Sequence, residues 1–204
     1  MRPSIAEIVR HHDDDPPEGA SPYVGGYRPP QFTVEIVEYD DTWPLAYARL
    51  AARVLGALPG EVVVSLDHVG STSVPGLPAK PIIDIDLTVA DSAREDSYVP
   101  ALEAAGFQHV IREPWWHEHR VLRHDSPEAH LHVFSPGSPE VVRHRMFRDW
   151  LAEHPADRAS YAEAKRSAAA ASNVAGGTMQ DYNALKQPVL REIYDRMFRA
   201  RGLL

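Results

Sequence analysis

The sequence predicts an α+β protein, in which a small mixed β-sheet is flanked by helices and followed by a C-terminal helical layer. Short apolar runs of strand length, separated by turn residues, fill the middle of the chain between residues 61 and 134. The last third instead spaces its apolar residues as amphipathic helices do. With 204 residues, the chain has the length of one ordinary domain.

The individual elements follow from the same patterns. Runs that alternate apolar and polar residues, or that are rich in β-branched residues, predict strands at 33–38, 61–67, 81–89, 107–111, 120–123 and 130–134. Helical spacing and capping residues predict helices at 42–56, 91–106, 138–153, 155–171 and 178–201. Thr42, Ser138 and Thr178 are the expected N-caps, and Gly176-Gly177 separates the last two helices.

The first 30 residues offer few apolar groups to bury, and we expect most of them to form a flexible arm. Proline and glycine are frequent here, and only Ile5, Ile8 and Val9 have the spacing of a short helix. The run His-His-Asp-Asp-Asp at 11–15 has residue types that bind metals, but a solvated tail is the preferred interpretation. We therefore divide the chain into an arm, 1–30, and one domain, 31–204.

Composition argues against several classes of protein. The formal net charge of −8 argues against a general nucleic-acid binder. No apolar run reaches the roughly 18 residues of a membrane span, and the first residues lack a signal-peptide pattern, so we expect a cytoplasmic protein without a membrane partner. Because cysteine is absent, disulfides, thiolate zinc sites and a cysteine nucleophile are excluded.

The most informative feature is a glycine-serine turn that is followed by two carboxylates. Gly70-Ser71 comes after the predicted strand 61–67, and Asp84 and Asp86 lie one residue apart in the next strand. Side chains at i and i+2 of a strand point to the same face, so these carboxylates lie together. A divalent cation, Mg²⁺ or Mn²⁺, is the usual remedy for their repulsion, and a glycine turn lets the backbone approach a phosphate. The pattern predicts a metal–phosphate site.

The residues around this motif resemble the GrpB family, a poorly characterised branch of nucleotidyltransferase-fold proteins. The resemblance lies in HVGSTSVPG at 68–76 and AKPIID at 79–84, and it continues in HLHV at 130–133 and FRDWL at 147–151. It covers about residues 33–200. It implies a sheet of nucleotidyltransferase type, a nucleoside triphosphate as ligand, and transfer of a nucleotidyl group to a small-molecule acceptor.

Residue roles follow from the motif and from the resemblance. Asp84 and Asp86 would hold the metal, and His132 would complete the site or act as a base. The expected phosphate-binding residues of the loop and the following strand entry are Gly70, Ser71, Thr72, Ser73 and Lys80. Later candidates for contacts to the nucleotide are Arg120, Arg148, Lys165, Tyr182 and Lys186. The alternatives are surface ion pairing for the arginines and, for the helices, tyrosine packing with lysines in solvent.

One departure from the wider superfamily concerns the third carboxylate, which polymerase-like nucleotidyltransferases usually take from a later strand. The corresponding strand here carries His130 and His132 on one face. A site with two carboxylates and one or two imidazoles would bind Mg²⁺ less well and would favour Mn²⁺ or Zn²⁺. The alternative is that one histidine orients an aspartate while the other packs.

The segment Trp-Trp-His-Glu-His at 115–119 has two interpretations. Its tryptophans and histidines would suit a substrate pocket or a zinc site, but a loop that covers a sheet edge has the same composition. We favour the structural interpretation and do not expect His117 or His119 to bind metal.

Three functions are compatible with these features. The preferred one is a metal-dependent nucleotidyltransferase-like enzyme that binds a nucleoside triphosphate and transfers a nucleotidyl group to, or adenylates, a small molecule. The alternative is a nucleotide-binding module with little or no catalysis, which the missing third carboxylate favours. A metal-dependent hydrolase ranks last, because among the eleven histidines only the His130/His132 pair has suggestive spacing.

Overall fold

Five strands form one mixed sheet in the computed structural model, which describes residues 2–11, 16–29 and 33–204. The strands are β1 (Val63–Val69), β2 (Ile83–Val89), β3 (Gln108–Glu113), β4 (His119–Asp125) and β5 (Glu128–Phe134). Their spatial order is β1-β2-β5-β4-β3. The central pair β2 and β5 is parallel, and the other neighbours are antiparallel. The predicted small mixed sheet is confirmed.

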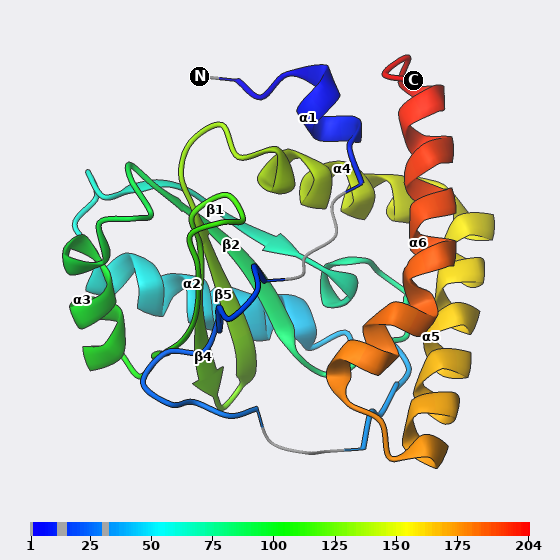
Figure 1. The fold of residues 1–204 in the computed structure, drawn as a ribbon, viewed down its shortest axis with the longest axis horizontal. Helices are drawn as coiled ribbons and strands as arrows, with labels where there is room; N and C mark the ends of the chain where they lie inside the picture. The colour runs from blue at the N-terminus through cyan, green and yellow to red at the C-terminus, as the bar shows by residue number, and fades with distance from the viewer. Residues whose placement is uncertain (1, 12–15, 30–32) are drawn as a thin grey trace.

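Helices lie on both faces of the sheet (Figure 1). They are α1 (Ile5–Val9), α2 (Trp43–Ala57), α3 (Val99–Ala104), α4 (Pro139–Glu153), α5 (Pro155–Ala175) and α6 (Met179–Ala200). The three long helices at the C-terminal end form the predicted helical layer, in which α5 and α6 run side by side. Thr178 is the N-cap of α6, as predicted, and it forms a capping box in which its hydroxyl accepts from the Asp181 amide and its own amide donates to the Asp181 carboxylate.

The main hydrophobic core lies between the sheet and the helices α2 and α3. Ile83, Ile85 and Leu87 point to this side of β2 and are at most 1 % exposed. They pack with residues such as Leu50 on α2 and Leu102 on α3. Because side chains alternate along a strand, burial of these three residues turns Asp84 and Asp86 to the opposite face, under the C-terminal helices. The core therefore fixes where the carboxylates point.

Two predicted elements differ from the structure. Residues 33–38 do not form a strand, since only Val37 pairs with Ala79 in an isolated bridge. The backbone of Val34 bonds instead to the side-chain amide of Asn173 on α5, which holds this segment away from the sheet. The single helix expected at 91–106 is a 3-10 turn (Glu95–Ser97) followed by α3.

The N-terminal segment makes defined contacts where the structure describes it. Helix α1 buries Ile8, and the buried guanidinium of Arg143 on α4 donates to the carbonyls of Ile8 and Arg10. Tyr23 forms an isolated bridge with Ile111 on the edge strand β3. The acidic part of the proposed metal-binding run, together with His12, lies outside the described residues. Within the described ranges, no helix is long and apolar enough to cross a membrane.

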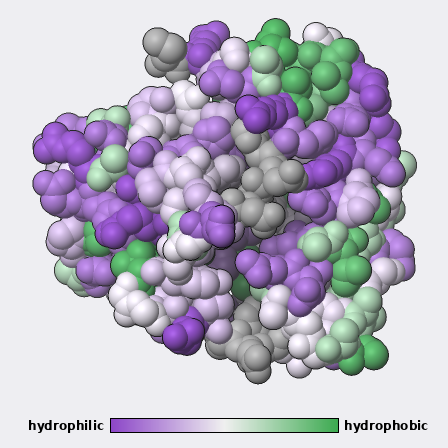
Figure 2. All heavy atoms as spheres, viewed as in Figure 1, coloured by the Kyte–Doolittle hydropathy of each residue, from purple (hydrophilic) through white to green (hydrophobic). Residues whose placement is uncertain are grey.

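The surface that Figure 2 displays is mostly hydrophilic. Hydrophobic side chains gather at its upper right, where Figure 1 places α1 and the C-terminal end of α6. Ile5 and Leu204 are both more than half exposed. Exposed apolar side chains are ordinary on a folded chain, and these two do not define a site.

Candidate functional site

The parallel pairing of β2 with β5 assembles a small group of metal-ligand types. Asp84 lies beside His130 in the register, and Asp86 lies beside His132. Ligand atoms of Asp84, His130 and His132 all lie within 4.8 Å of one another, and we call these three residues the Asp84 cluster. Oδ1 of Asp84 is 3.6 Å from Nδ1 of His130 and 3.8 Å from Nε2 of His132. The sheet thus brings together two imidazoles and one carboxylate.

Gly70 allows the Asp84 carboxylate to occupy this position. A Cβ atom added at Gly70 would lie 2.3 Å from Oδ2 of Asp84 and 2.9 Å from its Cβ. The backbone of Gly70 also has a φ of +67°, a conformation that side-chain-bearing residues rarely adopt. The glycine of the Gly-Ser turn is therefore needed both for the turn and for the close approach of the carboxylate.

The charge state of Asp84 follows from two opposing effects. Burial raises the pKa of this carboxyl, but the imidazoles of His130 and His132 outweigh burial and hold the pKa well below its usual range. The side chain is still one-third exposed. Asp84 is accordingly an ionised oxygen donor that remains accessible from the solvent side.

Asp86 occupies a different environment from the one the sequence led us to expect. It shares the face of Asp84, as predicted, but it is fully buried and lies outside the Asp84 cluster. Its carboxylate contacts Nδ1 of His144 on α4 at 2.9 and 3.2 Å. Burial opposes a charge on His144, but the Asp86 carboxylate dominates and raises the pKa of His144 to about 9. Asp86 and His144 form a buried ion pair that joins α4 to the sheet.

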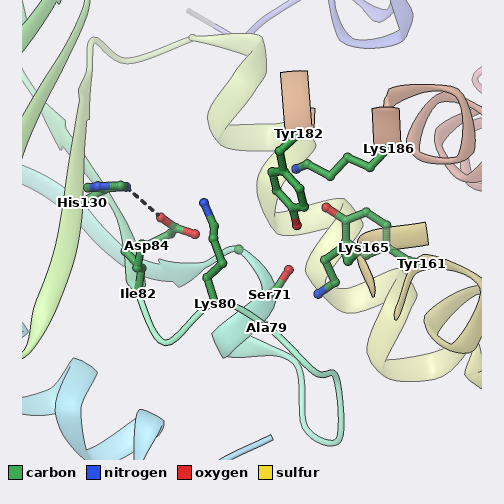
Figure 3. Close-up of a pocket in the computed structure, with 11 residues that line it drawn as sticks. Ser71, Ala79, Lys80, Ile82, Asp84, His130, Tyr161, Lys165, Tyr182 and Lys186 are labelled. Carbon is green, nitrogen blue, oxygen red and sulfur yellow. Dashed lines mark ion pairs between the residues drawn. The ribbon is translucent and has the colours of Figure 1, made fainter. Parts of the chain in front are cut away.

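A cavity of about 150 Å³ opens beside the Asp84 cluster, and we call it the lysine cavity. Its lining comes from the Gly-Ser turn, the loop that leads into β2, β2 itself, β5, α5 and α6: Gly70, Ser71, Ala79, Lys80, Ile82, Asp84, His130, Tyr161, Lys165, Tyr182 and Lys186. Figure 3 shows the ammonium group of Lys80 between Asp84 and the ring of Tyr182. Most of the predicted nucleotide-binding residues therefore meet in one place.

The three lysines of this cavity are the only lysines in the sequence, which contains 21 basic residues besides histidine. Among the described residues, the ion pairs use arginine and histidine cations, and none of the three ammonium groups takes part. Lys80 donates to the weak thioether acceptor of Met179, and Lys165 donates to the carbonyl of Pro78. Three lysine side chains that belong to no ion pair among the described residues therefore converge on one cavity, an arrangement that suits an anion.

The electrostatics of the cavity support this conclusion. Burial, reinforced by the nearby charges of Lys186 and Lys80, lowers the pKa of Lys165 to about 7. Burial also lowers the pKa of Lys80, although the Asp84 carboxylate opposes that shift. The ammonium groups of Lys80 and Lys186 lie 5.4 and 5.2 Å from the centre of the Tyr182 ring. A polyanion in the cavity would relieve the repulsion among the lysines.

Four of the predicted phosphate-binding residues do not line the lysine cavity. Thr72 is buried and donates to the carbonyl of Ile82, and the Ser73 hydroxyl donates to the Gly70 carbonyl, so both hydroxyls stabilise the turn. Arg120 is buried with Glu95 and Glu118, which is the ion-pairing alternative. The fourth is Arg148.

Arg148 borders a second cavity of about 170 Å³ on the α4 side of the Gly-Ser turn, which we call the aromatic cavity. It shares Gly70, Ser71 and Tyr161 with the lysine cavity, and its lining is completed by His144, Phe147, Arg148, Leu151, Leu190 and Tyr194. Arg148 itself donates to Asp149 and to the carbonyl of His68. Two cavities of different chemistry thus meet at Ser71.

Sequence reasoning missed the partner of Asp86 and left one further signal for the lysines unused. His144 belongs to a set of polar residues at helical spacing, which usually marks a surface face, and only the fold shows that it reaches Asp86. The convergence of the lysines has a signal in the composition, because a chain that uses arginine for its surface cations retains lysine at three positions. That signal was available without a structure.

Comparisons with known proteins agree with the fold and the motif. The profile of the family described as GrpB protein matches residues 33–196. A UPF0157 protein of Halalkalibacterium halodurans is 44 % identical over 173 residues, which cover 85 % of this chain and 87 % of that protein. A UPF0157 protein of Streptomyces coelicolor is 39 % identical, with coverage of 87 % and 97 %.

A solved structure and a group of longer proteins complete the comparison. The crystal structure of the conserved protein GrpB from Enterococcus faecalis has a TM-score of 0.67 and 27 % identity, and the match covers 80 % of this chain and 99 % of that one. A dephospho-CoA kinase of Mycolicibacterium paratuberculosis is 33 % identical, but the match covers only 46 % of that protein. These similarities show which proteins are related to this chain, but they do not show which reaction, if any, the shared region catalyses.

Proposed function

The chain belongs to the GrpB family, and we propose that it is a metal-dependent nucleotidyltransferase-like enzyme whose lysine cavity binds the phosphates of a nucleoside triphosphate. The observation that carries the proposal is the convergence of every lysine of the chain on the cavity that contains Asp84. Such an arrangement suits a ligand with several negative charges and an associated cation.

The residues of the Asp84 cluster fit a divalent cation. An ionised carboxylate and two imidazoles are accepted ligands for Mn²⁺ and Zn²⁺, and the one-third exposure of Asp84 leaves room for a phosphate oxygen or water. When bound, a cation would neutralise charge on the phosphates and on the transition state. Lys80 and Lys186 would contact the phosphates, and Ser71 would add a hydroxyl donor.

The proposed reaction is attack of an acceptor oxygen or nitrogen on the α-phosphorus of the triphosphate. The bond between the α-phosphorus and the oxygen that bridges to the β-phosphate breaks, and pyrophosphate leaves with the electron pair. The proton of a hydroxyl or amine acceptor passes to solvent. We place the acceptor in the aromatic cavity, because the two cavities meet at Gly70 and Ser71. Its lining of aromatic rings and leucines suits a small molecule with an apolar body.

Binding of a nucleotide with a metal ion provides the first test. Isothermal titration with ATP and Mn²⁺ should give an affinity that falls by about tenfold in Lys186→Met, because one charge-assisted contact to phosphate is lost. The matched control is Arg199→Met, which removes an exposed cation from the same helix outside the cavity. Equal affinities for both variants and the wild type would contradict the proposal.

Catalysis is tested separately, by release of pyrophosphate from ATP in the presence of a panel of small-molecule acceptors. Asp84→Asn should reduce the rate by orders of magnitude, since the cluster loses its only charged donor. Full turnover by Asp84→Asn would contradict the enzymatic proposal. Tight nucleotide binding without pyrophosphate release across the panel would instead support the alternative, a nucleotide-binding module.

The relatives named dephospho-CoA kinase do not change this proposal. The shared region is under half of each of those proteins, so the name describes a chain with a large additional part. The match does not assign kinase chemistry to the region that this chain shares with them. It is compatible with either an enzyme or a binding module that has been joined to another protein.

A further inference from the structure

A chain of hydrogen-bonded side chains reaches the Asp84 cluster from β3 and β4. Nδ1 of His119 is 2.7 Å from Oε2 of Glu113, and Nε2 of His119 is 3.0 Å from Nδ1 of His132. The planes of the two imidazoles differ by only 12°, which suits a hydrogen bond in the plane of the rings. Neither Glu113 nor His119 lines the lysine cavity. The hydrogen bond between His119 and His132 connects them to the cluster.

The chemistry of Glu113 and His119 fixes which group donates and which accepts in each of these two hydrogen bonds. A carboxylate only accepts, so Nδ1 of His119 carries the hydrogen and donates to Glu113. The other nitrogen of a neutral imidazole has a lone pair, so Nε2 of His119 accepts from Nδ1–H of His132. His119 is 4 % exposed and its ring stacks on that of Phe134 with the centroids 4.7 Å apart, surroundings that favour a neutral ring.

The hydrogen on Nδ1 of His132 determines what its other ring nitrogen, Nε2, presents to the Asp84 cluster. In the neutral form of the His132 ring, a hydrogen on Nδ1 leaves the lone pair on Nε2, which faces Oδ1 of Asp84 at 3.8 Å. Two electron-pair donors then face each other at a distance too long for a hydrogen bond. A cation between them would satisfy both, and His130 offers a third donor atom 3.6 Å from the same oxygen.

We propose that Glu113 and His119 are positioning residues, which fix His132 as a nitrogen donor and thereby make the cluster selective for a first-row transition metal ion over Mg²⁺. This inference rests on the metal site of the proposed function. Mg²⁺ takes oxygen ligands and gains little from an oriented imidazole, whereas Mn²⁺ and Zn²⁺ bind imidazole well. Partners that orient a ligating histidine typically contribute tenfold to hundredfold to metal affinity.

The backbone before β4 supports a dedicated role for this chain. His117 and Glu118 both have positive φ values, 54° and 50°, which cost conformational energy for residues other than glycine. The Ser92 hydroxyl holds this turn by donating to the carbonyl of Glu118. The ring of Trp116 then packs edge-on against His119, with the centroids 4.9 Å apart. The strained turn delivers His119 to His132 and restrains its ring.

Metal affinity in variants of His119 tests the proposal. Binding of Mn²⁺ is measured by electron paramagnetic resonance, with Asp84→Asn as the background for adventitious sites and Mg²⁺ as competitor. His119→Leu should weaken Mn²⁺ binding by about tenfold to hundredfold and leave Mg²⁺ binding unchanged. His119→Gln should recover most of the affinity, because its amide oxygen can accept from Nδ1–H of His132.

The matched control is His109→Leu, which removes another buried histidine from the neighbouring strand β3. His109 contacts the carbonyl of Ile111 and lies outside the Asp84 cluster, so its loss should leave Mn²⁺ affinity unchanged. Long-range ¹H–¹⁵N correlation spectra of the metal-free protein give an independent readout. They should show His132 with its hydrogen on Nδ1, and Glu113→Gln or His119→Leu should change that tautomer.

The possible outcomes separate this inference from the proposed function. Wild-type Mn²⁺ binding no stronger than that of Asp84→Asn would overturn the metal site itself. Site-specific binding that His119→Leu leaves unchanged, or that Mg²⁺ matches, would overturn only the role of the histidine chain. A hydrogen on Nε2 of His132 would also overturn it. The inference would be supported if His132 carries its hydrogen on Nδ1, if His119→Leu loses Mn²⁺ affinity, and if His119→Gln recovers it.

Discussion

At the scale of single residues, the site depends on the contact between Gly70 and Asp84. The motif suggests a glycine that makes room for a phosphate, and the structure adds that the glycine makes room for the Asp84 carboxylate. Both demands exclude a side chain at this position. The residue is therefore a structural requirement of the proposed metal site.

Gly70→Ala should weaken metal binding as well as stability. The new Cβ would collide with Asp84, and the positive φ adds strain, so we expect a loss of about 1–3 kcal/mol in the free energy of unfolding and displacement of the carboxylate. Gly76→Ala is the control, because Gly76 also has a positive φ but has nothing within 4 Å of an added Cβ. Chemical denaturation and Mn²⁺ titration of both variants measure the difference. Equal metal affinities would contradict this account.

The buried pair of Asp86 and His144 makes a prediction about pH. The pKa of His144 is raised to about 9 in the folded protein, so the pair contributes fully below the unfolded pKa near 6.5 and is lost as pH rises through about 9. Between these values wild-type stability should fall, by up to about 3 kcal/mol, relative to His144→Gln. Urea denaturation between pH 6 and 10 measures this, and parallel pH profiles for the two proteins would contradict it.

At the scale of elements, the sequence predicts the five strands of the sheet better than the segments around them. The structure places each of these strands within two residues of its predicted bounds. Residues 33–38 alternate as a strand does, but their backbone partners come from a helix side chain, which a local pattern does not reveal. Likewise, the side chain of Ser92 is bound by Ser135 and by the backbone at Glu118, which favours a turn over a long helix at 91–106.

The helices α5 and α6 deliver Lys165 and Lys186 to the lysine cavity, and this arrangement predicts a pH dependence of nucleotide binding. Because the pKa of Lys165 is lowered to about 7, a bound triphosphate would favour its charged form, and binding would take up a proton. ATP affinity should therefore fall by about tenfold as pH rises from 6 to 8.5. Isothermal titration of Lys165→Met with ATP gives the part of the pH dependence that comes from protonation of ATP itself. If ATP affinity depended on pH equally in this variant and in the wild type, the role given to Lys165 would be contradicted.

At the scale of the whole molecule, the N-terminal segment packs against the C-terminal helical layer through α1. Composition indicates an arm with little to bury, yet Ile8 is 9 % exposed and joins the cluster around α4 and α6. The spacing of Ile5, Ile8 and Val9 predicts the short helix, but three apolar residues in a polar segment do not indicate where that helix docks. The docked helix also provides two carbonyl acceptors for the buried Arg143.

Ile8→Asp should destabilise the folded protein by about 2–3 kcal/mol, because an unpaired carboxylate would enter an apolar cluster. Ile5→Asp is the control, since Ile5 lies on the same helix and is 55 % exposed. The thermal unfolding midpoint should fall for the first variant and stay near the wild-type value for the second. Equal midpoints would mean that α1 does not contribute to stability.

The site as a whole was partly predictable. The turn, the carboxylates and both histidines follow from the motifs, because their positions are local to two strands. Two other features depend on which elements pack together over long distances in sequence. They are the pairing of Asp86 with His144 and the hydrogen bonds that link Glu113 through His119 to His132. Contacts of this kind arise from the fold and have no local pattern.

The central claim is that the lysine cavity holds a metal-bound polyphosphate, and a crystal structure with Mn²⁺ and a non-hydrolysable ATP analogue tests it most directly. We predict an anomalous Mn²⁺ peak about 2.0–2.3 Å from donor atoms of Asp84, His130 and His132. The phosphates should lie among Lys80, Lys165 and Lys186. An empty cavity at saturating ligand, or a triphosphate bound elsewhere on the molecule, would contradict the account.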